Sequence, residues 1–459
     1  MKRWKKPKLE RLRQRRWNAE LRRRSRRRTR VLVQLPRGRL SSVISLLRSR
    51  MRGRNIAQYD WGKQNWVIKV PKVFSLTHNA EASLDVIYSV VQVARSKRRR
   101  LWFDHTDCVE IGLGASAVLD VVTMSLEEEW HASRQPYLIG GDHSRNQTVV
   151  NLVRCTGLTK HLNVPGQEAA PEIAARFTRT ELHRGHRSSG TALQGSSDQE
   201  RVASGLAKHL DGCFRKAAGH RLTRAGLREI VRWAGEVITN AEEHSGQNEW
   251  YAISYMAPTA ETIPGGGEPL TVGECHLVVF CFGRSIFESL HDPNTPDDTK
   301  RQLSLLASEL AKRNVFGRSQ RFSPRDLWTL YALQEGVSRF SPRPGKTSRG
   351  SGTVQMIDAF QTLGDSTNPH YNPEMVVISG ETRIFFDSRY RLGPPSSGGN
   401  RMVIAFNRPN DLAERPDPKH VHSLAAFLPG TVLSLRFFID RRHLEKVANP
   451  ITMTEETDS

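Results

Sequence analysis

The sequence lacks the cysteine pattern of a disulfide framework or of a structural zinc site. Five cysteines are scattered along the chain without any C-x-x-C pair, at Cys108, Cys155, Cys213, Cys275 and Cys281. Disulfide-rich domains carry even numbers of closely spaced cysteines, and structural zinc ligands come in short-spaced pairs. This cysteine usage favours a protein of the reducing cytosol.

Long hydrophobic runs are also missing. No stretch of 18 apolar residues occurs, which is the length that a membrane-spanning helix needs. A secretory signal is not expected, because no apolar segment with a cleavage site follows the N-terminal charges. Hydrophobic residues make up 37% of the 459 residues, which is enough for packed cores. We therefore expect a cytoplasmic protein of two or three domains.

Positive charge is concentrated at one end of the chain. The formal net charge is +22, and residues 1–54 hold 22 Lys and Arg against two Glu, a net of +20. We interpret residues 1–55 as a basic, disordered arm. Such an arm binds nucleic acid through counterion release, or an anionic membrane surface. The alternative is a solvated charge run with no partner.

Residues 60–165 alternate between strand and helix patterns. Three apolar runs have the length of strands, at 66–71, 101–104 and 136–140. Helical apolar periods cover 80–96 and 115–130 between them. This alternation predicts a small α/β layer domain.

The order of these elements resembles a STAS domain, the fold of anti-anti-sigma factors. Two phrases carry the resemblance, Val109-Glu-Ile-Gly-Leu-Gly-Ala-Ser116 before the second helix and Asn151-Leu-Val-Arg-Cys-Thr-Gly-Leu-Thr-Lys-His-Leu162 at the end. The family's phospho-acceptor lies in a D-S/T-S-G turn, whereas this turn has no hydroxyl before Ser116.

A polar linker is expected at 166–197, and a long amphipathic helix follows it at 227–245. The apolar residues of that helix recur at three- and four-residue steps, at Leu227, Ile230, Val231, Ala234, Ile238 and Ala241. Thr223 is the expected N-cap, and Ser245-Gly246 the expected stop. Glu236, Asn240 and His244 stand at i, i+4 and i+8, so they share one stripe beside the apolar face.

The string Glu236-Val-Ile-Thr-Asn240-Ala-Glu-Glu-His244 resembles the N-box of the GHKL ATPases, and the E-x-x-x-N-A-x-x-H form of the anti-sigma-factor serine kinases in particular. The resemblance implies a Bergerat-fold α/β sandwich over residues 198–445, a mixed sheet with helices on one face. It also implies bound ATP and Mg²⁺, with Asn240 as the magnesium ligand. Glu236 would orient or deprotonate the attacking hydroxyl, and His244 would belong to the same site.

Three later segments continue this resemblance. Cys275 to Ile286 matches the family's V-x-D-x-G-x-G-I box at Gly283 and Ile286, with Cys281 in place of the aspartate that reads adenine. A phosphate cradle is implied before the next helix, at Arg349, Gly350, Ser351, Gly352 and Thr353, where glycines let backbone amides approach an anion. Gly430-Thr431 matches the closing G-T, whose threonine supports adenine binding. An insertion at 287–348 separates the first two boxes, and 446–459 is a tail.

Two functions are consistent with these residues. The first is an enzyme that binds ATP with magnesium and hydrolyses it slowly, or transfers phosphate to a protein serine, in regulation with a protein partner. The second is a non-catalytic nucleotide-sensing scaffold that the basic arm tethers to nucleic acid. The intact Glu236 and Asn240 favour the enzyme. Cys281 favours the scaffold, because a thiol is a weak hydrogen-bond partner.

Overall fold

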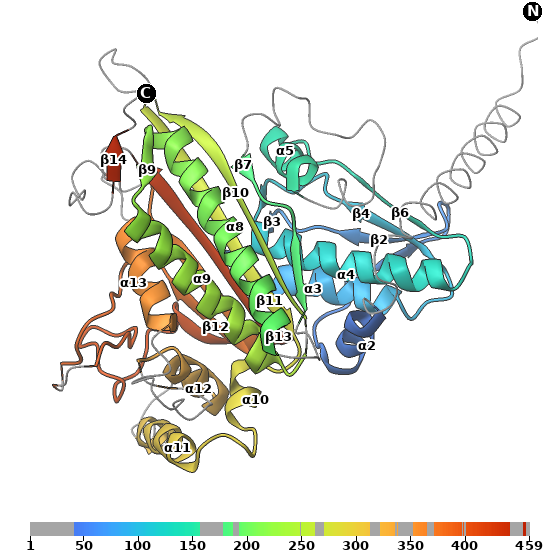
Figure 1. Ribbon diagram of the computed structural model, residues 1–459. Helices are drawn as coiled ribbons and strands as arrows, with labels where there is room; N and C mark the ends of the chain where they lie inside the picture. Colours follow the sequence, from blue (N-terminus) through green and yellow to red (C-terminus); the bar gives the residue numbers. More distant parts are fainter. Residues whose placement is uncertain are drawn as a thin grey trace, which may run out of the picture.

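The structure is a computed structural model that mixes helices with two main sheets, as expected for an α+β protein (Figure 1). It describes residues 41–156, 178–186, 192–247, 249–261, 270–312, 322–335, 337, 352–364, 371–396, 398, 401–440 and 453–455. Across these ranges, no helix has the length and apolar content needed to cross a membrane.

The first part of the chain forms a small α/β unit, the N-terminal module, over residues 41–156. Its sheet has the order β1-β2-β4-β6, with strands β1 (Gln58–Asp60), β2 (Asn65–Lys69), β4 (Arg100–Asp104) and β6 (Leu138–Asp142). Strands β2, β4 and β6 are parallel, and β1 is antiparallel to β2. The helices are α2 (Ser41–Arg50), α3 (Ala80–Val93), α4 (Leu113–Ala132) and α5 (Gln147–Thr156), and β3 (Val73–Phe74) pairs with β5 (Glu110–Ile111). The three strands and two helices predicted between 66 and 140 are confirmed.

The rest of the chain, the C-terminal module, is built on a six-stranded sheet of order β12-β13-β11-β10-β7, with β8 also on β10. Its strands are β7 (Thr178–Arg179), β8 (His183–His186), β10 (Glu249–Glu261), β11 (Leu270–Phe282), β12 (Glu374–Phe386) and β13 (Val421–Asp440). Every described pairing is antiparallel, so the expectation of a mixed sheet is wrong. Part of the range read as a linker, 166–197, supplies β7 and β8, which pair with the edge of β10.

Helices α8 (Ala192–Ala218), α9 (Arg224–Ser245) and α13 (Gly352–Gly364) pack together on this sheet. Their buried residues form one core with the inward residues of the strands, such as Leu206, Ile238, Ile357, Leu277 and Leu433. The insertion contributes α10 (Ile286–Leu290), α11 (Asp297–Lys312) and α12 (Pro324–Ala332). A small separate pair joins β9 (His220–Leu222) to β14 (Met453–Glu455).

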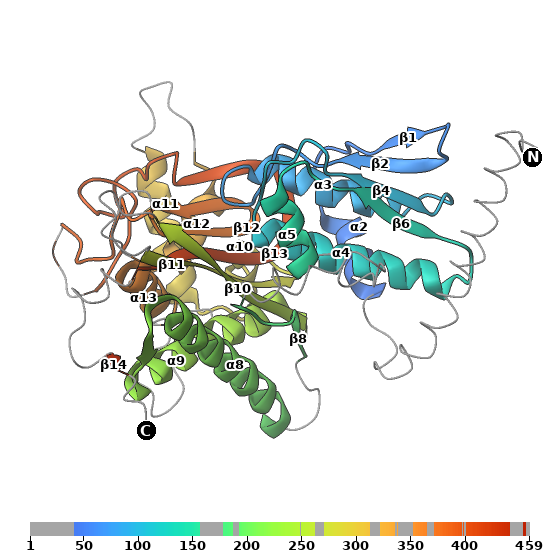
Figure 2. The ribbon, with the colours of Figure 1, turned by 90° about the horizontal axis from the view of Figure 1, so that it is seen from above.

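The opposite face of the large sheet is covered as well, so the expectation of helices on one face is wrong. Residues Val278 and Phe280 of β11 and Val432 of β13 share a second core with α2, α3 and α4 of the N-terminal module. Figures 1 and 2 show these three helices beside the large sheet, apart from α8 and α9. The physical reason is that successive strand residues point to opposite faces, and both sets are apolar here. The two modules are therefore one packed body.

The first turn of α4 lies inside this contact. A Cβ on Gly114 would meet the Ser434 hydroxyl of β13 at 2.9 Å, so glycine permits the close approach of α4 to the sheet. Ser116, the nearest hydroxyl to the turn, is only 4% exposed. The segment that resembles the phospho-acceptor turn therefore packs, at Gly114, against β13 of the C-terminal module.

The end of the basic arm belongs to the fold. Helix α2 buries Val43, Ile44 and Leu47 in the second core. The backbone of Arg52 then pairs with Phe427 of β13 in both directions, at 3.1 and 2.9 Å. The range 1–55 is therefore not an arm throughout, and residues 1–40 lie outside the described residues.

A charged network ties the two modules at their edge. His78, before α3, contacts Glu110 of β5 through Nδ1 (2.6 Å) and Glu374 of β12 through Nε2 (2.9 Å). Glu374 also pairs with Arg436 of β13 at 2.9 Å. The hydrogen bonds to Glu110 and then Glu374 raise the pKa of His78 from 6.5 to about 9.

We predict that this network makes stability depend on pH. Because the folded pKa of His78 is raised, its contribution is fully present below about pH 6.5 and is lost as the pH rises through about 9. The wild-type melting temperature should therefore fall more over this interval than that of His78→Gln. Thermal unfolding at several pH values measures the difference, with His131→Gln on α4 as the control. Parallel pH profiles for wild type and His78→Gln would contradict the prediction.

Candidate functional site

Helix α9 forms as its sequence predicts. Thr223 is the N-cap, and its hydroxyl accepts a hydrogen bond from the Gly226 amide at 3.1 Å. Gly246 ends the helix in the left-handed conformation at φ 66°, which glycine adopts without steric cost. The buried residues Ile230, Ala234 and Ile238 face the sheet. The helix is therefore held firmly enough to position a polar stripe.

The stripe lies on the flank of α9 away from α8. Thr239 and Glu242 face α8, because both contact its Gln199. At 100° per residue, Glu236 and Asn240 turn toward the other side of the helix. Figure 1 shows α9 lying between α8 and α13, and α13 packs on α9. Glu236 is exposed and Asn240 half-buried, so both are accessible.

His244 continues the helix backbone one turn further, and its side chain lies outside the described residues. Arg349, Gly350 and Ser351 of the expected phosphate cradle lie outside the described residues altogether. Helix α13 begins at Gly352, with Thr353 half-buried in its first turn. The structure therefore brings the stripe helix and the helix after the cradle side by side.

A polar row crosses three strands on the face that carries these helices. Cys281 of β11 lies opposite Thr431 of β13, and Thr431 lies opposite Ser379 of β12. The Thr431 and Ser379 hydroxyls are 2.8 Å apart, and Ser379 accepts a hydrogen bond from the Ile286 amide at 2.7 Å. Two of these residues were expected in one site. Ser379 was missed, because it ends an apolar strand run and belongs to no motif.

The Cys281 thiol is neutral at pH 7. It is 2% exposed, and burial raises its pKa to about 12. A buried neutral thiol donates and accepts hydrogen bonds weakly, unlike the carboxylate at this position in the resembling family. Hydrogen bonding in the row therefore comes from the hydroxyls of Thr431 and Ser379.

Gly283 allows the end of β11 to approach the end of α9. Its φ is 134°, and a Cβ there would lie 2.2 Å from the Ser245 carbonyl oxygen. The Arg284 amide donates to that same carbonyl at 2.7 Å. Ser285 then caps α10 in a reciprocal capping box with Glu288. The turn 283–285 is thus fixed by α9 on one side and by α10 on the other.

The end of the basic arm reaches this turn. Arg50 of α2 donates to the Gly283 carbonyl oxygen at 2.8 Å and pairs with Glu288 at 2.6 Å. No local pattern signals this contact, since 233 residues separate Arg50 from Gly283. Arg50 therefore supports the turn from the other module.

The residues present suit the magnesium and phosphates of ATP better than they suit its adenine. Asn240 offers an amide oxygen, and magnesium in proteins takes few protein ligands beside phosphate oxygens and water. Within the described ranges, no three His, Cys, Asp or Glu side chains gather as a metal cluster. Where the resemblance places the adenine, the polar row offers hydroxyls and a neutral thiol in place of a carboxylate.

No protein-family model, curated protein or solved structure matches this chain. The assignment of a function therefore rests on the motifs and on the geometry of α9, α13 and the polar row.

Proposed function

We propose that the C-terminal module is a GHKL-type ATP-binding domain of Bergerat fold and that the N-terminal module is STAS-like. The observation that carries the proposal is the adjacency of α9 and α13 above the Cys281–Thr431–Ser379 row. Motifs that are far apart in the sequence thus belong to one face of one sheet. The protein acts in intracellular regulation with a protein partner.

Each residue has a stated role in this proposal. Bound Mg-ATP supplies the transferable phosphoryl group. Asn240 holds the cation through its amide oxygen, and Gly352 and Thr353 begin the helix whose amides face the phosphates. Glu236 accepts the proton of the attacking hydroxyl, of water or of a protein serine. Its exposed position suits a nucleophile that arrives from outside.

The nucleotide-sensing scaffold is the second candidate, and the buried thiol of Cys281 favours it. Without a carboxylate to read the adenine amino group, the site would discriminate weakly between ATP and other triphosphates. A scaffold of this kind binds nucleotide as a signal and needs no turnover.

We expect Asn240→Ala to weaken Mg-ATP binding by about tenfold or more, because losing 1.4 kcal/mol of binding energy is a factor of ten. Isothermal titration with ATP and magnesium measures this. Thr239→Ala is the matched control, since this residue faces α8 on the same helix. An unchanged affinity in a folded Asn240→Ala protein would remove the GHKL assignment.

We expect Glu236→Gln to keep ATP binding and to lower turnover by about 10²–10⁴-fold, because it removes a general base without changing size. A phosphate-release assay and a transfer assay with candidate serine-containing partners measure the effect. Glu200→Gln, an exposed carboxylate of α8, is the control. If wild type binds ATP but shows no turnover under any of these conditions, the scaffold replaces the enzyme.

The arm is proposed to bind nucleic acid, and the structure sets where to truncate it. Deleting residues 1–40 removes 18 Lys and Arg and two Glu, a net of +16, and leaves α2 in place. We expect this variant to retain much less DNA and RNA than wild type. Retention of DNA and RNA by wild type should weaken steeply as the salt concentration rises. ATP affinity should remain.

Deletion of 1–54 is the comparison. It also removes the buried Val43, Ile44 and Leu47, and truncating one buried leucine or isoleucine typically costs about 2–5 kcal/mol. We expect this longer deletion to destabilise the protein. Retention that survives removal of 1–40 would place the polyanion site elsewhere in the chain.

A further inference from the structure

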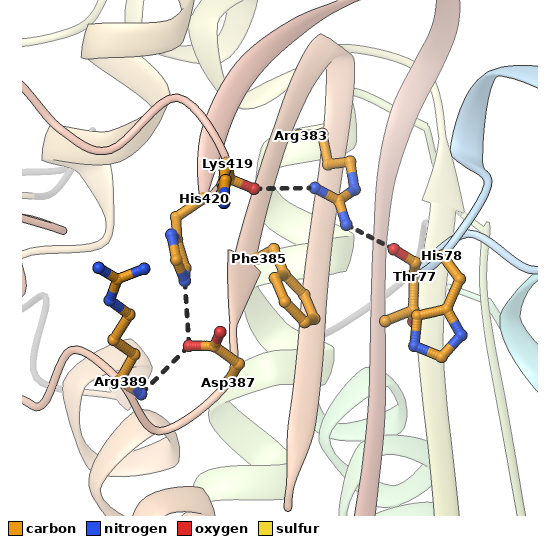
Figure 3. A pocket seen from close by; sticks show the side chains of 8 residues that line it. All are labelled: Thr77, His78, Arg383, Phe385, Asp387, Arg389, Lys419 and His420. Carbon is orange, nitrogen blue, oxygen red and sulfur yellow. Dashed lines mark hydrogen bonds and ion pairs between the residues drawn. The ribbon is translucent and has the colours of Figure 1, made fainter.

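A hollow of about 420 Å³ opens where the two modules meet, which we call the seam hollow (Figure 3). Thr77 and His78 come from the N-terminal module. The remaining lining residues come from the end of β12 and the segment before β13, namely Arg383, Phe385, Asp387, Arg389, Lys419 and His420.

The seam hollow is separate from the proposed nucleotide site. Ile384 and Phe386 of β12 point into the first core, on the face of the sheet where α12 packs on β12. Because strand residues alternate between faces, Arg383 and Phe385 point to the other face of the sheet. An occupant of the seam hollow therefore lies on the opposite side from Cys281 and Thr431.

Arg383 is a half-buried cation in the seam hollow. Its guanidinium donates to the carbonyl oxygens of Thr77 and Lys419, and it lies 5.0 Å from the Phe385 ring (Figure 3). Among the described residues it forms no ion pair with a carboxylate. Burial lowers its pKa to about 10, which Glu374 only partly offsets. A partly desolvated charge of this kind is costly unless an anion meets it.

The two other Arg and Lys side chains that line the seam hollow have no short ion pair among the described residues. In the described part of the chain, the exposed Lys419 ammonium forms no ion pair, and Arg389 approaches Asp417 only at 3.5 Å. His420 is 2% exposed and contacts Asp387 through Nε2 at 3.0 Å. Its Nδ1 lies 3.4 Å from Asp417 without the geometry of a hydrogen bond. The lining thus has three Arg and Lys side chains against one carboxylate.

We propose that the seam hollow binds a phosphate group, either inorganic phosphate or a small phosphate monoester. Arg383 and Lys419 are its principal ligands, and Arg389 closes the outer side. Charge-assisted hydrogen bonds from guanidinium and ammonium groups are the strong contacts that phosphate favours. Because both modules line the hollow, the bound anion stabilises their packing at this edge. The assignment does not rest on the proposed ATP site.

The test is titration of the full chain with inorganic phosphate and with glycerol 3-phosphate, against chloride at the same ionic strength. We expect both phosphates to raise the melting temperature beyond chloride, and calorimetry to give saturable binding. Lys419→Gln should weaken that binding by about tenfold, because it removes a charge-assisted hydrogen bond to the phosphate. Lys419 is exposed, so its replacement should leave the fold intact.

Two controls make the outcome decisive. Arg408→Gln removes an exposed charge from a neighbouring loop and should bind phosphate like wild type. Asn240→Ala should do so as well, which separates this site from the nucleotide site. Tighter binding of glycerol 3-phosphate would identify a monoester as the ligand, and equal binding a free phosphate group. A melting temperature that responds equally to chloride, or equal losses in Lys419→Gln and Arg408→Gln, would overturn the proposal.

Discussion

The pairing of β13 with β11 and β12 is the constraint on which the rest of the structure depends. Strand β13 runs from Val421 to Asp440, and its inward and outward residues enter different cores. Leu433 packs beneath α8, α9 and α13, whereas Val432 packs against the N-terminal module. A strand with two apolar faces is stable in water only when both are covered. The two modules are therefore held to one sheet by hydrophobic burial, which acts without specific geometry.

Polar contacts at the edges of that interface fix how the two modules are oriented and aligned against each other. His78, Glu374 and Arg436 form charged contacts at one edge, and Arg50 joins α2 to the Gly283 turn at another. These side chains are partly buried, and the raised pKa of His78 means that its charged form stabilises the folded protein. The contacts also select one arrangement, because a shift of the modules would leave partly buried charges unpaired. The seam hollow is the exception, because Arg383 there forms no ion pair with any carboxylate of the described residues.

This arrangement connects the basic arm to the proposed nucleotide site. Helix α2 ends at Arg50, which holds the carbonyl of Gly283, and Gly283 lies against the end of α9. The stripe with Asn240 lies on the same helix, little more than one turn before that contact. The described end of the arm, α2, and the proposed site are therefore neighbours through two packed elements, although the sequence suggests independent units.

The sequence by itself determined the local elements. The period of α9, its cap at Thr223 and its stop at Gly246 are consequences of nearby residues, because helix periodicity and capping are local properties. Strands β2, β4 and β6 of the N-terminal module were predictable from their own apolar runs, whereas β1, β3 and β5 were not predicted. Tertiary structure decided the rest. Strand β10 carries Pro258 and has no alternating pattern, and it forms because β11 pairs with it along its length. Strand β12 continues from Glu374 to Phe386 through an irregularity at Gly380 in its register with β13. The meeting of Cys281, Thr431 and Ser379, and of Thr77 with Arg383, joins residues far apart in the chain. Such contacts depend on which apolar faces bury one another, and no local pattern encodes that choice.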